Sequence, residues 1–293
     1  MNIIGHQKVK NLLDKAIAKK AVSHAYLFYG PESVGKFMMA FDFAQKLIGS
    51  EKKINSDLII LKPEIEEKKG VTKKLAIKIE QIRDFQHQLS LTAQSDGYKV
   101  AIIEEAEMLN KAAQNGLLKT LEEANPGVVL ILVTSDEKKL LPTILSRCQK
   151  MRFGTVAESE LRAELAKRGG REMEDIIFWS LGRPGLALNF LANDEELAFR
   201  KETAAELKKF FTQSVVERFA VAEEMVKDGE LLTKKLNLWL IIFREIILGR
   251  RVVARITKVK ALNLLDQTEK SLATIKNTNS NARLIMENLF LNF

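Results

Sequence analysis

Residues 30–37 read Gly-Pro-Glu-Ser-Val-Gly-Lys-Phe, with a lysine directly after the second of two spaced glycines. This spacing matches a phosphate-binding loop, in which glycines let backbone N–H groups curl around phosphates and the lysine reaches the terminal phosphates. The pattern then requires Ser or Thr, whose hydroxyl is a Mg²⁺ ligand, but this chain has Phe37. The loop predicts a site for ATP or ADP, and Phe37 argues against Mg²⁺ there. The expected nucleotide contacts in the loop are Gly30, Pro31, Gly35, Lys36 and Phe37.

The segments on either side of the loop strengthen this interpretation. Residues 24–29 are short and rich in aromatic side chains, as expected of a strand, and residues 38–48 have no glycine or proline and are typical of a helix. A strand, a glycine loop and a helix in this order are the context that the motif needs. The competing interpretation is a glycine turn that simply ends a buried strand.

A second group of polar residues follows the apolar run 100–103, which predicts a buried strand. Glu104 and Glu105 stand at its carboxyl end, where nucleotide hydrolases of this loop class carry one Mg²⁺-binding carboxylate and one general base. Glu105 is the candidate base, vestigial or weak, and Glu104 is one methylene longer than the usual Asp. An acidic helix N-terminus is the simpler alternative. Thr134 and Ser135 follow the next apolar run, where they could contact a phosphate or be turn residues.

Strands and helices alternate through the first half of the chain, and the strand segments are continuously apolar. This pattern predicts a parallel α/β sheet that is buried on both faces. Segment 64–74 is rich in charge and predicts a solvated loop or excursion. After residue 154 the pattern is helical. We expect a nucleotide-binding core over 1–154, a small helical domain over 155–201 and a helical bundle over 202–293. The remaining expected helices are 7–20, 79–91 and 111–123, and the remaining strands are 57–61 and 128–133.

Composition limits the class of protein. The single cysteine, Cys148, excludes an internal disulfide and a zinc site made of several cysteines. The apolar run 236–243 is far too short to cross a bilayer, and the N-terminal residues lack the features of a signal peptide. These features predict a cytoplasmic protein with no membrane association.

The net charge is +8 and the isoelectric point is near 9.3. This excess suits an anionic partner such as nucleic acid, bound through its backbone without reading sequence. Solubility alone is the other explanation, because acidic and basic residues are interleaved over most of the chain.

Three stretches together resemble the clamp-loader branch of the AAA+ ATPases. They are 98–110, with Val-Ala-Ile-Ile-Glu-Glu-Ala-Glu at its centre, 112–123, and 140–149, which contains Ser146-Arg147-Cys148. The Ser-Arg-Cys triplet matches a motif of clamp-loader subunits. The approach to the phosphate loop, 24–31, and the entry segment 4–7 also resemble this family. The resemblance covers about residues 1–190 and implies an AAA+ core followed by a helical lid. The remainder fits the family's all-helical collar only in being helical, and its apolar stripes could equally be the core of a monomeric bundle.

Within the family, the chain is most similar to the delta-prime class of bacterial DNA polymerase III clamp-loader subunits. Three departures from the ATPase pattern favour this class: Phe37, Glu104, and Leu186 at a position where ATPase subunits tend to carry a sensing arginine. The usual four-cysteine zinc module after the first helix of the core is also absent from 46–57. An active gamma/tau-type ATPase and a stand-alone AAA+ interaction or repair factor are the alternatives.

The resemblance implies a role for Arg147 as an arginine finger offered in trans to the ATP site of an adjacent gamma/tau-type subunit. An always-charged, planar guanidinium suits a γ-phosphate, and such fingers often come from a neighbouring chain. The implied partners are gamma/tau-type and delta-type subunits in a hetero-oligomer, the sliding clamp, and primed DNA bound non-specifically. The alternative is that Arg147 forms a salt bridge at the start of a strand.

Overall fold

The structure is a computed structural model that describes residues 3–49, 56–68, 71–91, 97–123, 126–169, 172–250, 256–277 and 280–293. The chain forms two compact units, Met1–Ala192 and Asn193–Phe293. We describe each unit by itself. The finer division into core, lid and collar stays a prediction.

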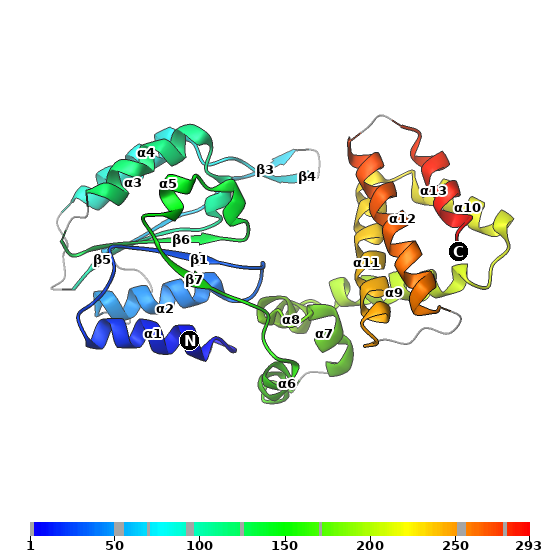
Figure 1. Cartoon of the computed structure of the whole chain (residues 1–293), viewed down its shortest axis with the longest axis horizontal. Coiled ribbons are helices and arrows are strands. Elements are labelled where there is room, and N and C mark those ends of the chain that lie inside the picture. The colour runs from blue at the N-terminus through cyan, green and yellow to red at the C-terminus, as the bar shows by residue number, and fades with distance from the viewer. Residues whose placement is uncertain are drawn as a thin grey trace. The chain divides into compact units, whose positions relative to one another are not determined.

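The first unit is built around a parallel sheet of five described strands, in the order β2-β5-β6-β1-β7 (Figure 1). Every neighbouring pair is parallel, with Leu27 of β1 level with Leu132 of β6, for example. The predicted parallel α/β sheet is therefore confirmed. The strands are β1 Ala25–Tyr29, β2 Leu58–Leu61, β5 Lys99–Ile103, β6 Val128–Thr134 and β7 Gln149–Arg152.

Helices cover both faces of this sheet (Figure 1). On one side lie α1 (Gln7–Ala18) and α2 (Lys36–Ile48), and on the other α3 (Ile79–Ser90), α4 (Lys111–Glu122) and the short α5 (Pro142–Leu145). Successive strand residues point to opposite faces, so that Leu27 packs with the α3–α4 side and Phe28 with the α1–α2 side. Because both faces are covered, the inner strands β1, β5 and β6 are apolar at nearly every position, whereas the edge strand β7 buries only Met151.

The charge-rich segment 64–74 was predicted as a solvated loop or excursion, and the structure contains an excursion with regular strands in place of a loop. It contains an antiparallel hairpin of β3 (Ile65–Lys68) and β4 (Val71–Lys74), which projects from the sheet (Figure 1). The register sets Glu66 opposite Lys73, and opposite charges at paired positions stabilise two strands without an apolar core. Charge density therefore indicated that this segment is solvated, but it did not indicate that its backbone forms two paired strands.

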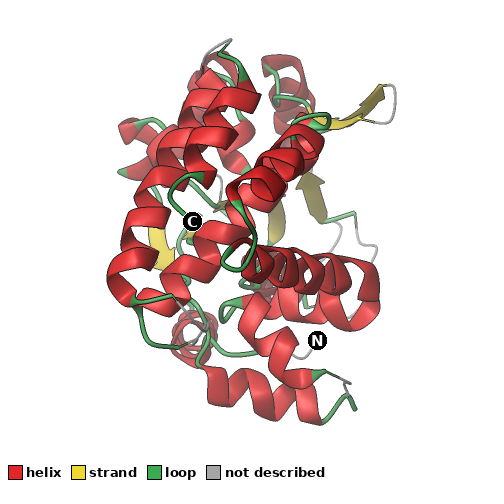
Figure 2. Cartoon of the chain, turned by 90° about the vertical axis from the view of Figure 1, so that its right-hand side faces the viewer, coloured by secondary structure: helices red, strands yellow, loops and turns green. Residues whose placement is uncertain are grey.

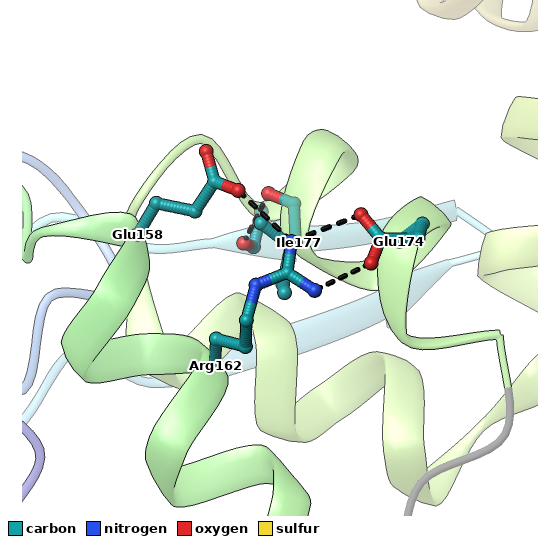
Figure 3. Close-up of polar contacts among 5 residues, drawn as sticks. Glu158, Arg162, Glu174 and Ile177 are labelled. Carbon is teal, nitrogen blue, oxygen red and sulfur yellow. Dashed lines mark hydrogen bonds and ion pairs between the residues drawn. The ribbon is translucent and has the colours of Figure 1, made fainter.

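Three helices complete the first unit: α6 (Glu158–Ala166), α7 (Met173–Ser180) and α8 (Pro184–Ala192). Arg162 of α6 bridges to Glu174 of α7 through two hydrogen bonds and also to Glu158, at 3.0 Å, one turn away on its own helix (Figure 3). These side chains are exposed, so water screens the ion pairs and they contribute little to stability. The buried Trp179 and Phe190 provide the apolar contacts of this part.

The second unit consists of α9 (Asp194–Phe210), α10 (Val215–Met225), α11 (Gly229–Ile247), α12 (Lys258–Asn277) and α13 (Ala282–Phe290). In the described residues of this unit all regular structure is helical, as Figure 2 shows by colour. An aromatic cluster forms its core, in which Trp239 and Phe290 are fully buried with ring centroids 5.9 Å apart. Leu238, Ile242 and Ile246 of α11 are also buried, so this apolar stripe packs within the unit.

Candidate functional site

The candidate site lies at the carboxyl edge of the sheet, where β1, β5 and β6 end beside one another. Because these strands are parallel, the segments that follow them meet at one edge, which is the usual ligand-binding edge of open α/β sheets. A cavity of about 340 Å³ opens there. The predicted residues that line it are Gly35, Lys36, Phe37, Glu104, Glu105, Thr134 and Ser135. Residues that the sequence reasoning did not select also line it: Glu32, Ser33, Met38, Lys74, Glu107, Val133 and Gly185.

Two glycines give the phosphate loop its path. Gly30 has φ +142°, and a Cβ there would lie 1.9 Å from the carbonyl oxygen of Phe153, so no other residue fits without moving the backbone. Gly35 has φ +98° and precedes the first turn of α2. Both glycines are needed for backbone geometry, as the motif predicts.

Lys36 is nearly buried, and its ammonium binds the loop itself. Its Nζ donates to the carbonyl oxygens of Gly30 at 2.8 Å and Pro31 at 2.5 Å. Burial lowers the pKa of Lys36, and the charges of Glu107 and Glu32 oppose that shift. Gly30 and Pro31 therefore contribute to the site through their contact with Lys36, whereas Lys36 itself lines the cavity.

Phe37 occupies the position where the motif has a hydroxyl residue. It contacts both the apolar core and the cavity. Its ring is partly buried against the core on the α2 face of the sheet, with the Phe41 ring centroid 6.3 Å away. It also lines the cavity. A hydrocarbon ring offers no oxygen to a metal ion, so the residues present do not fit the usual Mg²⁺ ligand set of a phosphate loop.

The two predicted carboxylates differ in their surroundings. Glu104 is half-buried, and burial together with the charge of Glu105 raises its pKa. Glu105 has a left-handed backbone with φ +52° and forms an ion pair with Lys74, whose Nζ lies 2.6 Å from Oε1. It also precedes a short 3-10 helix, η1 (Ala106–Met108), so the helix-start interpretation describes its backbone correctly. The Lys74 ammonium thus occupies the carboxylate that the sequence suggests as a general base.

Glu107 is a site residue that the sequence reasoning missed. It accepts a hydrogen bond from the backbone N–H of Ser135 at 3.0 Å and another from the Ser135 hydroxyl. Burial acts to raise the pKa of Glu107, but hydrogen bonds from Ser135 and Thr134 outweigh it, and the pKa is lower than usual. Thr134 also accepts a hydrogen bond from the backbone of Asp136 at 3.1 Å, which is a turn contact. The available signal was the position of Glu107 in the same acidic run as Glu104.

Two other segments fix the phosphate loop from outside. His6 Nε2 hydrogen-bonds to the carbonyl oxygen of Val34 at 2.9 Å, and the N–H of Gly185, at the start of α8, donates to Ser33 at 2.7 Å. A Cβ on Gly185 would lie 2.8 Å from that Ser33 oxygen, so the contact needs a glycine. Leu186 follows directly and is half-buried. Helix α8 thus meets the phosphate loop through its backbone.

Arg147 lies outside this cavity, between α5 and β7. Its Nη2 pairs with Glu122 of α4 at 2.6 Å, and its Nη1 donates to the carbonyl oxygen of Thr143 at 3.0 Å. About a third of the side chain is exposed, at 34%. The structure therefore contains the salt bridge that was the alternative for Arg147, and it leaves the guanidinium at the surface.

The neighbouring Cys148 offers a direct test of this packing, because it is the one cysteine of the sequence. It is buried against the α3–α4 core, and burial raises the pKa of its thiol to about 12. The thiolate is the reactive form, so we expect alkylation at mildly alkaline pH to be roughly a hundredfold or more slower in the native chain than in urea. Mass spectrometry of timed iodoacetamide reactions measures this ratio. Equal rates would contradict the buried position of Cys148.

Two negative findings concern the described residues alone. Among them, no three or more His, Cys, Asp or Glu side chains form a group that could hold a metal ion. None of their helices is both long and apolar enough to span a membrane.

The strand order, the phosphate loop and the acidic strand end define a protein of the AAA+ fold class. A DNA polymerase III gamma subunit-related protein from Thermotoga maritima superposes with a TM-score of 0.54 at 19% identity, covering 95% of this chain and 97% of that one. RuvB from the same organism superposes with a TM-score of 0.50 at 16% identity, covering 98% and 87%. At these identities the likeness supports the fold alone.

The sequence comparisons define the family more closely. The family described as DNA polymerase III, delta subunit, matches residues 5–157, which is just over half of the chain, and the chain belongs to this clamp-loader family. It is 34% identical to DNA polymerase III subunit delta' of Pseudomonas aeruginosa, covering 55% of this chain and 54% of the relative. It is 35% identical to subunit delta' of Bacillus subtilis, covering 50% and 46%, and 30% identical to subunit tau of B. subtilis, covering 57% and 31%. The chain spans about half or less of the length of these curated relatives.

Proposed function

We propose that this chain is a delta-prime-type subunit of the bacterial replicative clamp loader that contributes little ATP hydrolysis of its own. The observation that carries the proposal is that a chain of the clamp-loader family has a candidate nucleotide site with few groups able to catalyse hydrolysis. Phe37 offers no metal ligand, and Glu105 is bound to Lys74. The phosphate loop itself is intact in its glycines and lysine, which suits nucleotide binding without turnover.

Arg147 is the catalytic contribution that we propose, made to the ATP site of an adjacent gamma/tau-type subunit. Its place at the surface, away from the chain's own cavity, supports a role in trans. The residues that hold it, Glu122 and Thr143, would orient the guanidinium before a neighbour arrives. Together with a delta-type subunit, the assembly would open the sliding clamp and load it on primed DNA, with the basic surplus meeting the DNA backbone.

The similarity to tau subunits favours one alternative, an active gamma/tau-type ATPase. Steady-state ATP hydrolysis by the isolated chain separates the two functions. We expect hydrolysis at background level, unchanged by Lys36→Ala. The reason is that Glu105 is ion-paired with Lys74 and that Phe37 offers no metal ligand. Robust turnover that Lys36→Ala abolishes would instead establish the ATPase.

Co-purification tests the subunit role independently of nucleotide chemistry. We expect the chain to assemble with gamma/tau-type and delta-type subunits when the three are expressed together. A chain that binds neither would point to the other alternative, a stand-alone AAA+ interaction or repair factor.

A further inference from the structure

Lys74 is a cation at the candidate nucleotide site that no part of the phosphate-loop motif accounts for. It is the last residue of β4, at the base of the charged hairpin, where the Leu75 N–H donates to the Glu64 carbonyl at 2.8 Å. The hairpin leaves the sheet after β2, at the same carboxyl edge at which β5 ends. This placement makes Lys74 part of the cavity lining together with Lys36.

The hydrogen-bonding state of the two lysines differs. Lys36 directs its ammonium at two carbonyl oxygens of its own loop. Lys74 is about half exposed at 53%, and among the described residues Glu105 is the acceptor to which its ammonium is bonded. An ammonium carries three donors, so Lys74 can keep Glu105 and still donate to a phosphate oxygen.

Acidic side chains outnumber basic ones around the cavity, so the positive charge of Lys74 matters for binding an anionic ligand. Four glutamates line it, Glu32, Glu104, Glu105 and Glu107, against the two lysines. A polyphosphate that entered without a metal ion would meet these carboxylates, and in a phosphate-loop site Mg²⁺ normally neutralises the charge. Phe37 weakens the site for that ion. Positive charge must then come from the protein, and Lys74 is the lysine that the loop does not already use.

We infer that Lys74 is a nucleotide-binding residue that takes the place of Mg²⁺ here, donating directly to the phosphates of a bound ADP or ATP. Its ion pair with Glu105 pre-positions the ammonium and at the same time neutralises the carboxylate that would repel the nucleotide. The site would therefore hold nucleotide without a metal ion. This inference rests on the nucleotide site of the proposed function and not on assembly with other subunits.

Calorimetric titration of the full chain with ADP, in Mg²⁺ and in EDTA, tests the metal independence. We expect the same affinity in both conditions. In EDTA, Lys74→Gln should weaken ADP binding about tenfold or more, because it removes a charge-assisted hydrogen bond. Lys74→Arg should retain most of the affinity.

Lys73 supplies a matched control, since it is the preceding residue of the same strand and its side chain points to the opposite face of the hairpin. Lys73→Gln removes the same net charge from the same strand and should leave ADP affinity unchanged. Equal losses in the two variants would mean that only the overall charge matters, which would overturn the inference. Thermal unfolding of each variant shows whether the hairpin substitutions alter folding.

A double-mutant cycle with Glu105→Gln separates direct contact from simple neutralisation. If Lys74 touches phosphate, Lys74→Gln/Glu105→Gln remains weaker than Glu105→Gln alone. If Lys74 acts only by neutralising Glu105, the double variant binds ADP as tightly as Glu105→Gln does. That result would exclude a direct contact between Lys74 and phosphate. ADP binding that requires Mg²⁺, or no ADP binding by the unaltered chain, also overturns the inference. A chain that still co-purifies with its partner subunits would keep the proposed subunit role in either case.

Discussion

Replacing Arg147 by alanine is expected to lower ATP hydrolysis at the adjacent subunit's site by roughly 10³ to 10⁵, the usual effect of losing an arginine finger. The guanidinium would stabilise charge on the transferring phosphoryl group, and alanine leaves that charge without a partner. The effect is cleanest in a complex in which only the ATPase copy next to this chain keeps a working phosphate loop. Steady-state phosphate release from that complex measures it.

The ion pair between Arg147 and Glu122 provides the matched control for this experiment. Glu122→Gln removes the negative charge but keeps an oxygen that can accept a hydrogen bond from the guanidinium, so it should retain most of the hydrolysis. Both variants should co-purify with the partner subunits as the unaltered chain does. An Arg147→Ala complex that assembles and hydrolyses ATP at the full rate would exclude the finger role and leave Arg147 as a salt-bridge residue.

Replacing Phe290 by alanine should destabilise the helical second unit by about 3–5 kcal/mol, the usual cost of emptying a buried aromatic site. Phe290 is fully buried, and its ring lies 4.8 Å from that of Phe210 and 5.7 Å from that of Phe293, measured between centroids. Trp239, whose ring centroid is 5.9 Å away, reports on this core directly. In a Trp179→Phe background, its fluorescence during urea unfolding gives the stability of the second unit.

The residue that follows Phe290 and caps the C-terminal end of α13 is the control for that measurement. Leu291 is 60% exposed, so Leu291→Ala should change the stability by no more than about 0.5 kcal/mol. If both substitutions cost the same small amount, α13 does not pack on the aromatic cluster as the structure has it.

Much of the sheet could be predicted from the sequence, because β1, β2, β5 and β6 are signalled by apolar runs, whereas β7, which reads Gln-Lys-Met-Arg, is not. Residues 100–103 and 128–133 are apolar at every position, which requires cover on both faces and therefore a parallel sheet. The hairpin of β3 and β4 could not be predicted in this way. Its strands are held by backbone pairing and cross-strand charges, and no apolar periodicity marks them.

The same contrast applies to the candidate site. Gly30, Gly35 and Lys36 are recognisable from the sequence because a phosphate loop needs these residue types at fixed spacing. Glu107 and Gly185 could not be selected, because their contacts with Ser135 and Ser33 join segments far apart in the chain.

By itself, the sequence determined the fold class and the phosphate loop of this protein, because apolar patterning and glycine spacing are local properties of a chain. The tertiary structure alone decided that Lys74 binds Glu105 and lines the cavity with Lys36. It also decided that Phe37 lies partly in the core and that Arg147 is held at the surface by Glu122. Those outcomes depend on which side chains meet across strands and helices that are distant in sequence. A charge or an apolar ring has its effect through the groups that it contacts, and only the folded chain determines those groups.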